Sequence, residues 1–163
     1  MFTLLLIVSS SQPLPDPCRL ISKLGQVHVE FDEAGEAYNR YVVDLGNDTR
    51  DGWIAISLSK DAESDYEDDV LLEIKKIIPD PCFFFIEGGG KNRSANLINQ
   101  FVLSLDASEP FLLDNDIGVI EDIKSVQKKI KAGVDWSNLH SKRSADIICR
   151  IEKRSAFHHL TKY

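Results

Sequence analysis

Four groups of residues in this 163-residue chain could bind an ion, a partner or a substrate. The first, Gly88 to Ser94, reads Gly-Gly-Gly-Lys-Asn-Arg-Ser and lies between a predicted strand and a predicted helix. Backbone N–H groups at such a place can hold a phosphate. A P-loop would need the pattern GxxxxGK[ST], but Asn92 follows Lys91. The sequence therefore excludes a P-loop and predicts a solvated loop, with a weaker anion site as the alternative.

The second segment, Asp114 to Gly118, begins like a calcium-binding loop because acidic residues occupy its first and third positions. The pattern then fails. Val119 stands at the sixth position, where such loops need glycine, and Ser125 stands at the twelfth, where they need a bidentate acid. Asn and Asp tolerate left-handed backbone, and glycine adopts it freely. The segment is therefore predicted to be a hairpin turn with no metal.

Histidines form the third group and give no convincing metal or catalytic site. His158 and His159 are adjacent, so on a helix they would point in different directions and could not bind one ion from a single face. His28 falls on the polar side of its predicted strand, with no nucleophile signature around it. We therefore predict no catalytic residue, no metal and no cofactor.

The fourth segment is acidic rather than catalytic. From Glu30 to Glu87 the chain has sixteen Asp and Glu against five Lys and Arg, a net charge of −11, and six of these acids surround Tyr66. Such a surface repels nucleic acid and anionic lipid and attracts a basic protein. An aromatic side chain ringed by charge can anchor an interface. We predict a protein-binding surface, with a plain solvated loop as the alternative, made of Asp61, Glu63, Asp65, Tyr66, Glu67, Asp68 and Asp69.

The apolar run from Phe2 to Val8 is predicted to be a central strand buried on both faces, because it lacks polar alternation. No basic residue precedes it, which argues against a signal peptide. No other apolar run approaches the roughly 20 residues of a membrane span. The three cysteines, Cys18, Cys82 and Cys149, are an odd number at wide spacing and favour a reducing compartment. We therefore expect a cytoplasmic protein without a membrane partner.

Hydrophobic periodicity and turn residues predict the remaining elements. Strands are expected near 27–31, 41–45, 53–58 and 82–86, helices near 19–24, 69–78, 95–105 and 122–131, and a strand-turn-strand unit at 110–120. This order indicates an α+β fold with a central, mostly antiparallel sheet of about six strands flanked by helices. We expect one domain, residues 1–136, followed by a basic tail, residues 137–163. The tail is expected to contain a helix, although its apolar residues follow a helical stripe only in part.

About a third of the chain resembles a known family. The resemblance rests on the aromatic run Phe83-Phe-Phe-Ile86, the helix from Ser94 to Leu103, the segment from Pro110 to Ile120, and Gly133-Val-Asp-Trp136. This order of segments resembles that of small bacterial immunity proteins. Such proteins protect a cell from the toxin domains of contact-dependent growth inhibition and related polymorphic toxin systems. The resemblance implies a non-enzymatic antitoxin that binds its toxin domain tightly and occludes or distorts the active site. We expect the two proteins to form a one-to-one complex.

The acidic charge is compatible with that implication. Many such toxins are nucleases with basic substrate clefts, and an acidic inhibitor can occupy such a cleft as a phosphate backbone would. Direct binding of nucleic acid by this chain is not expected. Two alternatives stay open: an acidic adaptor or regulatory protein with another basic partner, and an enzyme that acts on a phosphorylated small molecule at the Gly88 to Ser94 loop.

Overall fold

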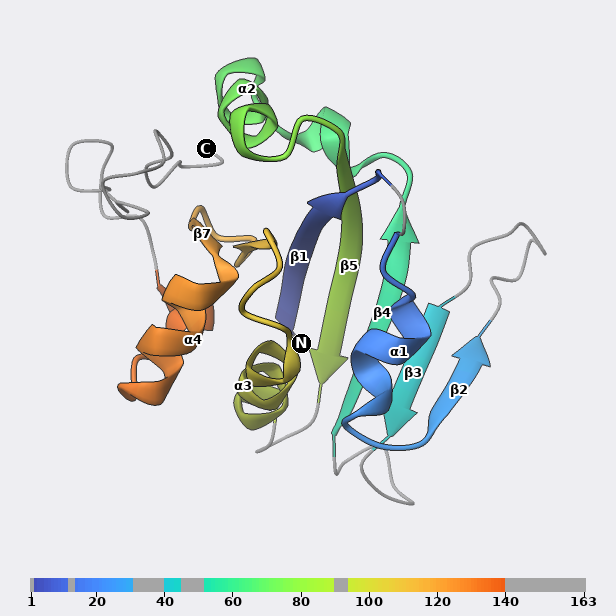
Figure 1. Ribbon diagram of the computed structural model, residues 1–163. Coiled ribbons are helices and arrows are strands. Elements are labelled where there is room, and N and C mark those ends of the chain that lie inside the picture. The colour runs from blue at the N-terminus through green and yellow to red at the C-terminus, as the bar shows by residue number, and fades with distance from the viewer. Residues whose placement is uncertain (1, 12–13, 31–39, 45–51, 90–93, 140–163) are drawn as a thin grey trace.

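A computed structural model describes residues 2–11, 14–30, 40–44, 52–89 and 94–139. Seven strands form one antiparallel sheet in the order β2-β3-β4-β5-β1-β6-β7 (Figure 1). The strands are β1 (Phe2–Ser9), β2 (Val27–Glu30), β3 (Arg40–Asp44), β4 (Trp53–Ser59), β5 (Pro81–Gly89), β6 (Leu112–Asp114) and β7 (Ile120–Asp122). The helices are α1 (Pro17–Ser22), α2 (Asp68–Ile77), α3 (Ser94–Ser104) and α4 (Ile123–Lys131), with the short 3-10 helices η1 (Ala62–Asp65) and η2 (Trp136–Asn138). The predicted α+β class is confirmed.

The strand β1 lies near the middle of the sheet, between β5 and β6. Leu4, Leu6 and Val8 point into the hydrophobic core on one face, whereas Leu5 and Ile7 point into the core on the other. All five side chains are buried. The prediction of a central strand buried on both faces is therefore confirmed.

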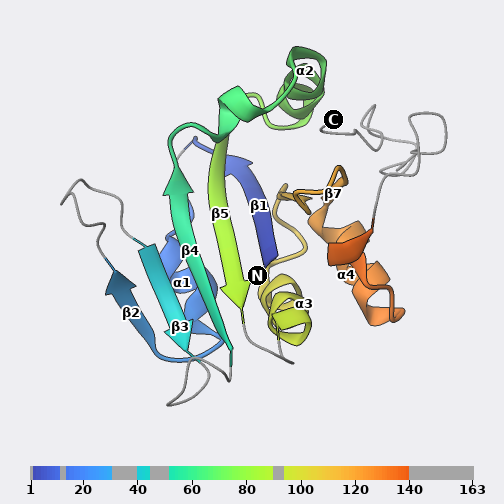
Figure 2. The same cartoon turned by 180° about the vertical axis from the view of Figure 1, so that it is seen from behind.

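Helices cover the two faces unequally. On one face, α1, α3 and α4 contribute Ile21, Phe101 and Val126 to the larger core (Figures 1 and 2). On the other face, η1 and α2 contribute Ala62 and Ile74 to a smaller core over β1, β5, β6 and β7. The α2 helix lies at the upper end of the strands in Figure 1. The sheet thus carries three helices on one face and the η1–α2 segment at one end of the other.

The prediction that the loop opens at Gly88 is wrong, because β5 continues through Gly89. Gly88 pairs with Phe2 of β1 and with Ile54 of β4. A Cβ atom at Gly88 would lie 2.0 Å from the Phe2 ring and 2.9 Å from the carbonyl oxygen of Trp53. Glycine is needed here for close approach inside a strand rather than for a loop. Lys91, Asn92 and Arg93 of the weaker anion site lie outside the described residues.

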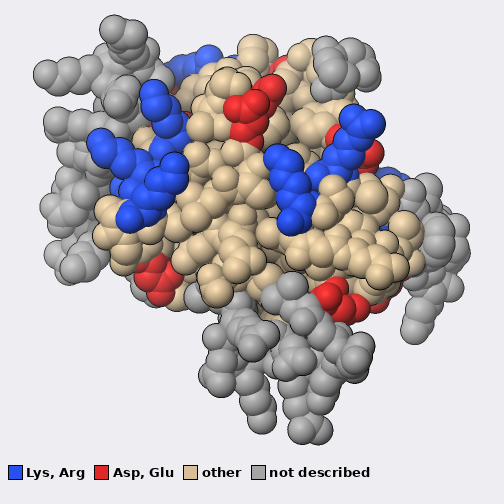
Figure 3. Space-filling model, turned by 60° about the horizontal axis from the view of Figure 1, so that its bottom comes forward, with Lys and Arg blue, Asp and Glu red and all other residues tan. Residues whose placement is uncertain are grey.

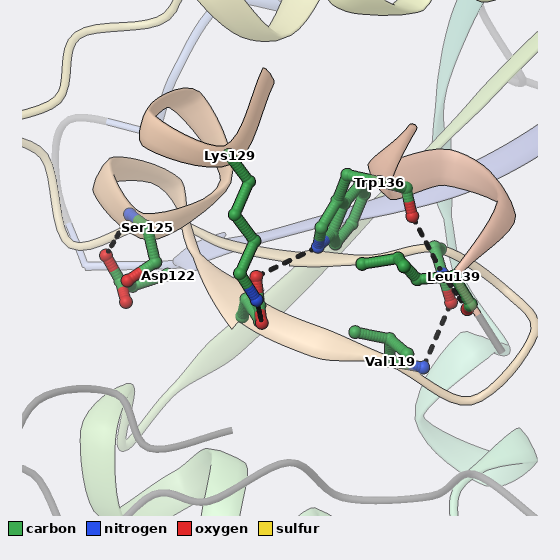
Figure 4. A network of polar contacts seen from close by, with 8 residues as sticks. Val119, Asp122, Ser125, Lys129, Trp136 and Leu139 are labelled. Carbon is green, nitrogen blue, oxygen red and sulfur yellow. Dashed lines mark hydrogen bonds and ion pairs between the residues drawn. The ribbon is translucent and has the colours of Figure 1, made fainter. Parts of the chain in front are cut away.

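Residues 115–119 form the turn of the β6–β7 hairpin, as predicted. Asp116 has a φ of 59° and Gly118 a φ of 105°, which are backbone conformations that Asp tolerates and glycine favours. The Asn115 side chain accepts a hydrogen bond from the Val119 N–H at 3.0 Å and donates to the Leu139 carbonyl at 2.8 Å (Figure 4). Within the described ranges, no group of three His, Cys, Asp or Glu residues is placed to hold a metal ion.

A buried carboxylate joins β7 to α4 and η2. Glu121 is fully buried, accepts a hydrogen bond from Trp136 Nε1 at 2.9 Å and pairs with Lys129 of α4 (Figure 4). Asp122 caps α4 by accepting a hydrogen bond from the Ser125 N–H at 2.9 Å. The helix ends before Gly133, whose φ of 80° confirms the predicted glycine stop.

Candidate protein-binding surface

Six acidic residues form one exposed surface at the η1–α2 segment, which we call the acidic ridge. Their side chains are all exposed. They lie just before η1, within it, and at the start of α2, at the end of the molecule where α2 is drawn in Figure 1. The members are Asp61, Glu63, Asp65, Glu67, Asp68 and Asp69. Six of the seven residues predicted as the binding surface are therefore brought together.

Local hydrogen bonds explain why this acidic run folds. Ser59 Oγ, at the end of β4, accepts from the Ala62 N–H at 3.0 Å, and the Ser64 hydroxyl donates to the Asp61 carbonyl at 2.7 Å. Asp68 and Asp69 occupy the first turn of α2, where negative charge interacts favourably with the helix dipole. The acidic composition therefore fits the local structure and does not oppose it.

The prediction that Tyr66 is an exposed anchor is wrong. Its side chain is only 6% exposed and lies in the smaller core. The ring lies 5.4 Å from that of Phe83, measured between centroids, and the hydroxyl donates to Asp114 Oδ2 at 2.7 Å. The chain turns inward between η1 and α2, so the aromatic side chain is buried although six acids lie within five residues of it in the sequence.

Tyr66 instead fastens the acidic ridge to the sheet. Asp114 of β6 is fully buried, and its other oxygen accepts from the Asp116 N–H at 2.8 Å. Burial, followed by the negative charge of Asp114, raises the pKa of Tyr66 far above its ordinary range. The phenol therefore stays protonated and keeps donating. This contact joins the acidic ridge to a strand 48 residues further along the chain.

An exposed leucine stands beside the ridge carboxylates. Leu72 is 58% exposed on α2, whereas Val70 and Ile74 on the same helix are buried. Asp68 and Asp69 precede it by four and three residues, so all three share one helix face. Sequence reasoning did not single out Leu72. The available signal was its position outside the apolar stripe of α2, since a leucine off that stripe must face solvent.

Most ridge carboxylates form no salt bridge within the described part of the chain. Glu63 pairs with Lys75 at 2.5 Å, while Lys76 pairs with Glu73, which is not part of the ridge. The other five acids form no salt bridge with any residue in the described ranges. Their negative potential is therefore available to a partner.

A separate polar cluster lies on β2, β3, β4 and β5, away from the ridge. Arg40 stacks over the Trp53 ring at 5.1 Å and pairs with Glu87 at 3.4 Å. His28 is exposed, as predicted, and its Nδ1 lies 3.6 Å from Asp44 Oδ2. These contacts link neighbouring strands across one face of the sheet and bring no nucleophile to the histidine.

The remaining candidates add no chemistry. Cys18 and Cys82 are free thiols, and burial raises the pKa of Cys82, which disfavours its reactive thiolate form. Cys149, His158 and His159 lie outside the described residues, as does the basic tail from residue 140 onward. No helix in the described ranges is both long and apolar enough to cross a membrane.

Comparison of the chain with protein-family models, with curated proteins and with solved structures finds no match.

Proposed function

We propose that this protein is an immunity protein that binds a basic toxin domain, of nuclease type, and blocks its active site in a one-to-one complex. One observation carries the proposal: the acidic ridge presents five exposed carboxylates that pair with no described cation. A nuclease cleft is built to bind a row of phosphates. A row of carboxylates held at one edge of a folded protein offers the same sign of charge.

Hydrogen bonds hold the acidic ridge in place on the sheet. Tyr66 fixes the segment between η1 and α2 to Asp114, and Ser59 fixes the start of η1. A surface that is ordered before binding loses less conformational entropy when the complex forms. The ridge is therefore suited to rapid, electrostatically steered association with a basic partner.

Leu72 provides an apolar contact that the charged side chains of the acidic ridge cannot provide. Exposed charge pairs contribute little to affinity, whereas an apolar side chain buried at the centre of an interface contributes more. Leu72 stands one helical turn from Asp68 and is 58% exposed. In the proposed complex it takes the anchoring place that was predicted for Tyr66.

The resemblance of residues 82–136 to immunity proteins favours a toxin over another basic partner. The test first asks whether an open reading frame beside this gene encodes a toxin domain. The affinity of this protein for that domain is then measured by isothermal titration, and protection is measured by growth of cells that express the toxin. Asp68→Lys and Leu72→Ala should each weaken binding about tenfold or more. Glu109→Lys makes the same charge change at another exposed site and should leave the affinity unchanged.

Two results would contradict the proposal. Wild-type affinity in a folded Asp68→Lys, Leu72→Ala double variant would place the interface elsewhere on the molecule. If the wild-type protein does not bind the neighbouring toxin domain, the proposed immunity function is wrong and the adaptor alternative is favoured.

A further inference from the structure

The outer side of α4 borders a cavity of about 510 Å³. Ala107, from the connection between α3 and β6, also lines this cavity. Figure 3 shows Lys and Arg side chains gathered in groups on this side of the molecule rather than spread evenly over it. The remaining lining residues are Asp122, Lys124, Ser125, Gln127, Lys128 and Lys131.

Three lysines that line this cavity have no salt-bridge partner among the described residues. Lys124, Lys128 and Lys131 are exposed, and none of them forms a salt bridge with a residue that the structure describes. Lys129 on the same helix is different, because it pairs with buried Glu121. Three such lysines on one helix face stand out in a chain whose formal net charge is −7.

Helix stability explains only part of this pattern. Lys128 and Lys131 lie in the last turn of α4, where positive charge interacts favourably with the helix dipole. Lys124 lies in the first turn, where the same dipole disfavours a cation and no acidic residue follows the cap. A residue placed against its local preference indicates a role beyond stability.

Hydrogen bonds position α4 beside the cavity, and a serine hydroxyl lies among the lining residues. The Gln127 amide donates to the carbonyls of Val102 and Leu105 at 3.0 and 2.9 Å, which ties α4 to α3. Asp122 is engaged as the helix cap through the Ser125 N–H. The Ser125 hydroxyl makes no hydrogen bond to any described residue, so it can donate to a ligand.

We propose that this cavity, which we call the α4 groove, binds a small molecule that carries two or more phosphate groups. The rise of an α-helix places Lys128 about 6 Å and Lys131 about 10 Å along the axis from Lys124. That spacing suits several linked phosphates better than a single one. Lysine binds phosphate as a point charge, and the volume matches that of small-molecule sites. This inference does not depend on the proposed immunity function.

The test measures binding of inorganic tripolyphosphate and of ATP to the full chain by isothermal titration at constant ionic strength. We expect saturable one-to-one binding. Lys124→Gln with Lys128→Gln should weaken it at least tenfold. The matched control, Lys60→Gln with Lys76→Gln, makes the same change in net charge on exposed residues far from α4 in the fold and should keep wild-type affinity. Equal affinity for both probes means that phosphates alone are recognised, and tighter binding of ATP means that the nucleoside also enters the α4 groove.

Chemical-shift changes in the wild-type protein give a second readout that needs no variant. Tripolyphosphate should shift the amide signals of Ala107 and Ser125 and leave those of the acidic ridge unchanged. The proposal is overturned if neither probe binds, if the control pair weakens binding as much as the α4 pair, or if a single-stranded oligonucleotide binds more tightly than both small probes.

Discussion

Replacing Tyr66 with phenylalanine removes one hydroxyl while the ring contact with Phe83 remains. The hydrogen bond lost is 2.7 Å long, and its acceptor is the fully buried carboxylate of Asp114. Hydrogen bonds to charged groups contribute about 1.5–3 kcal/mol to stability. We therefore expect the free energy of unfolding to fall by about 2 kcal/mol, which raises the ratio of unfolded to folded protein about 30-fold.

Urea denaturation at pH 7, followed by tryptophan fluorescence, measures this change. The denaturant dependence should stay the same while the midpoint falls. Tyr41→Phe is the control, because Tyr41 is half-buried in β3 and its hydroxyl makes no hydrogen bond to a described residue; its cost should be under about 0.5 kcal/mol. Equal losses in the two variants would refute the view that the Tyr66 hydroxyl fastens the acidic ridge.

The same contact should make the protein sensitive to alkaline pH. Burial, followed by the Asp114 charge, raises the pKa of Tyr66 above its ordinary value of 10.0. The folded state then keeps a proton that the unfolded chain releases. The contribution of Tyr66 is complete below pH 10 and is lost as the pH rises further, by about 1.4 kcal/mol per pH unit. Tyr66→Phe should lack this part of the slope between pH 10 and pH 11.

Two further substitutions test the region around β7. Gly118→Val forces a β-branched residue to a φ of 105° and should lower the free energy of unfolding by about 1–3 kcal/mol. Calcium should leave the melting temperature of the wild type unchanged. A calcium-dependent rise would contradict the structural role of the turn. Lys129→Met removes the cation from fully buried Glu121 and should cost about 3 kcal/mol, since breaking a buried pair leaves an uncompensated charge. Lys128→Met, on the exposed face, should change the free energy of unfolding by under about 0.5 kcal/mol. Similar losses in both lysine variants would show that the Lys129–Glu121 ion pair does not stabilise the fold.

Elements whose signals are local were predictable from the sequence. The run from Leu4 to Val8 identified a strand buried on both faces, and Gly133 identified the end of α4. The turn at Gly118 followed from residues that accept left-handed backbone. In each of these cases the deciding physics acts within a few residues, through hydrophobic periodicity or the φ angles that a residue can adopt.

Features set by distant contacts were not predictable in this way. Tyr66 stands among acidic residues, so its neighbours in the sequence suggested exposure, yet Phe83 and Asp114 bury it from two other strands. Gly88 looked like the start of a loop because the ring of Phe2, which excludes a side chain there, is 86 positions away in the sequence. The order of strands depends on the same kind of long-range pairing.

The position of β1 has a consequence for synthesis. This strand forms its hydrogen bonds with residues 81–88 and 112–114, so neither neighbour exists when β1 leaves the ribosome. At about 5–20 residues per second, the interval until β5, the first of these partners, is made lasts about 4–16 seconds. Throughout that time the segment from Leu4 to Val8 is an unpaired strand of five apolar side chains, which is the kind of sequence that chaperones bind and that aggregates in their absence. The order of the strands therefore sets how long the nascent chain remains vulnerable.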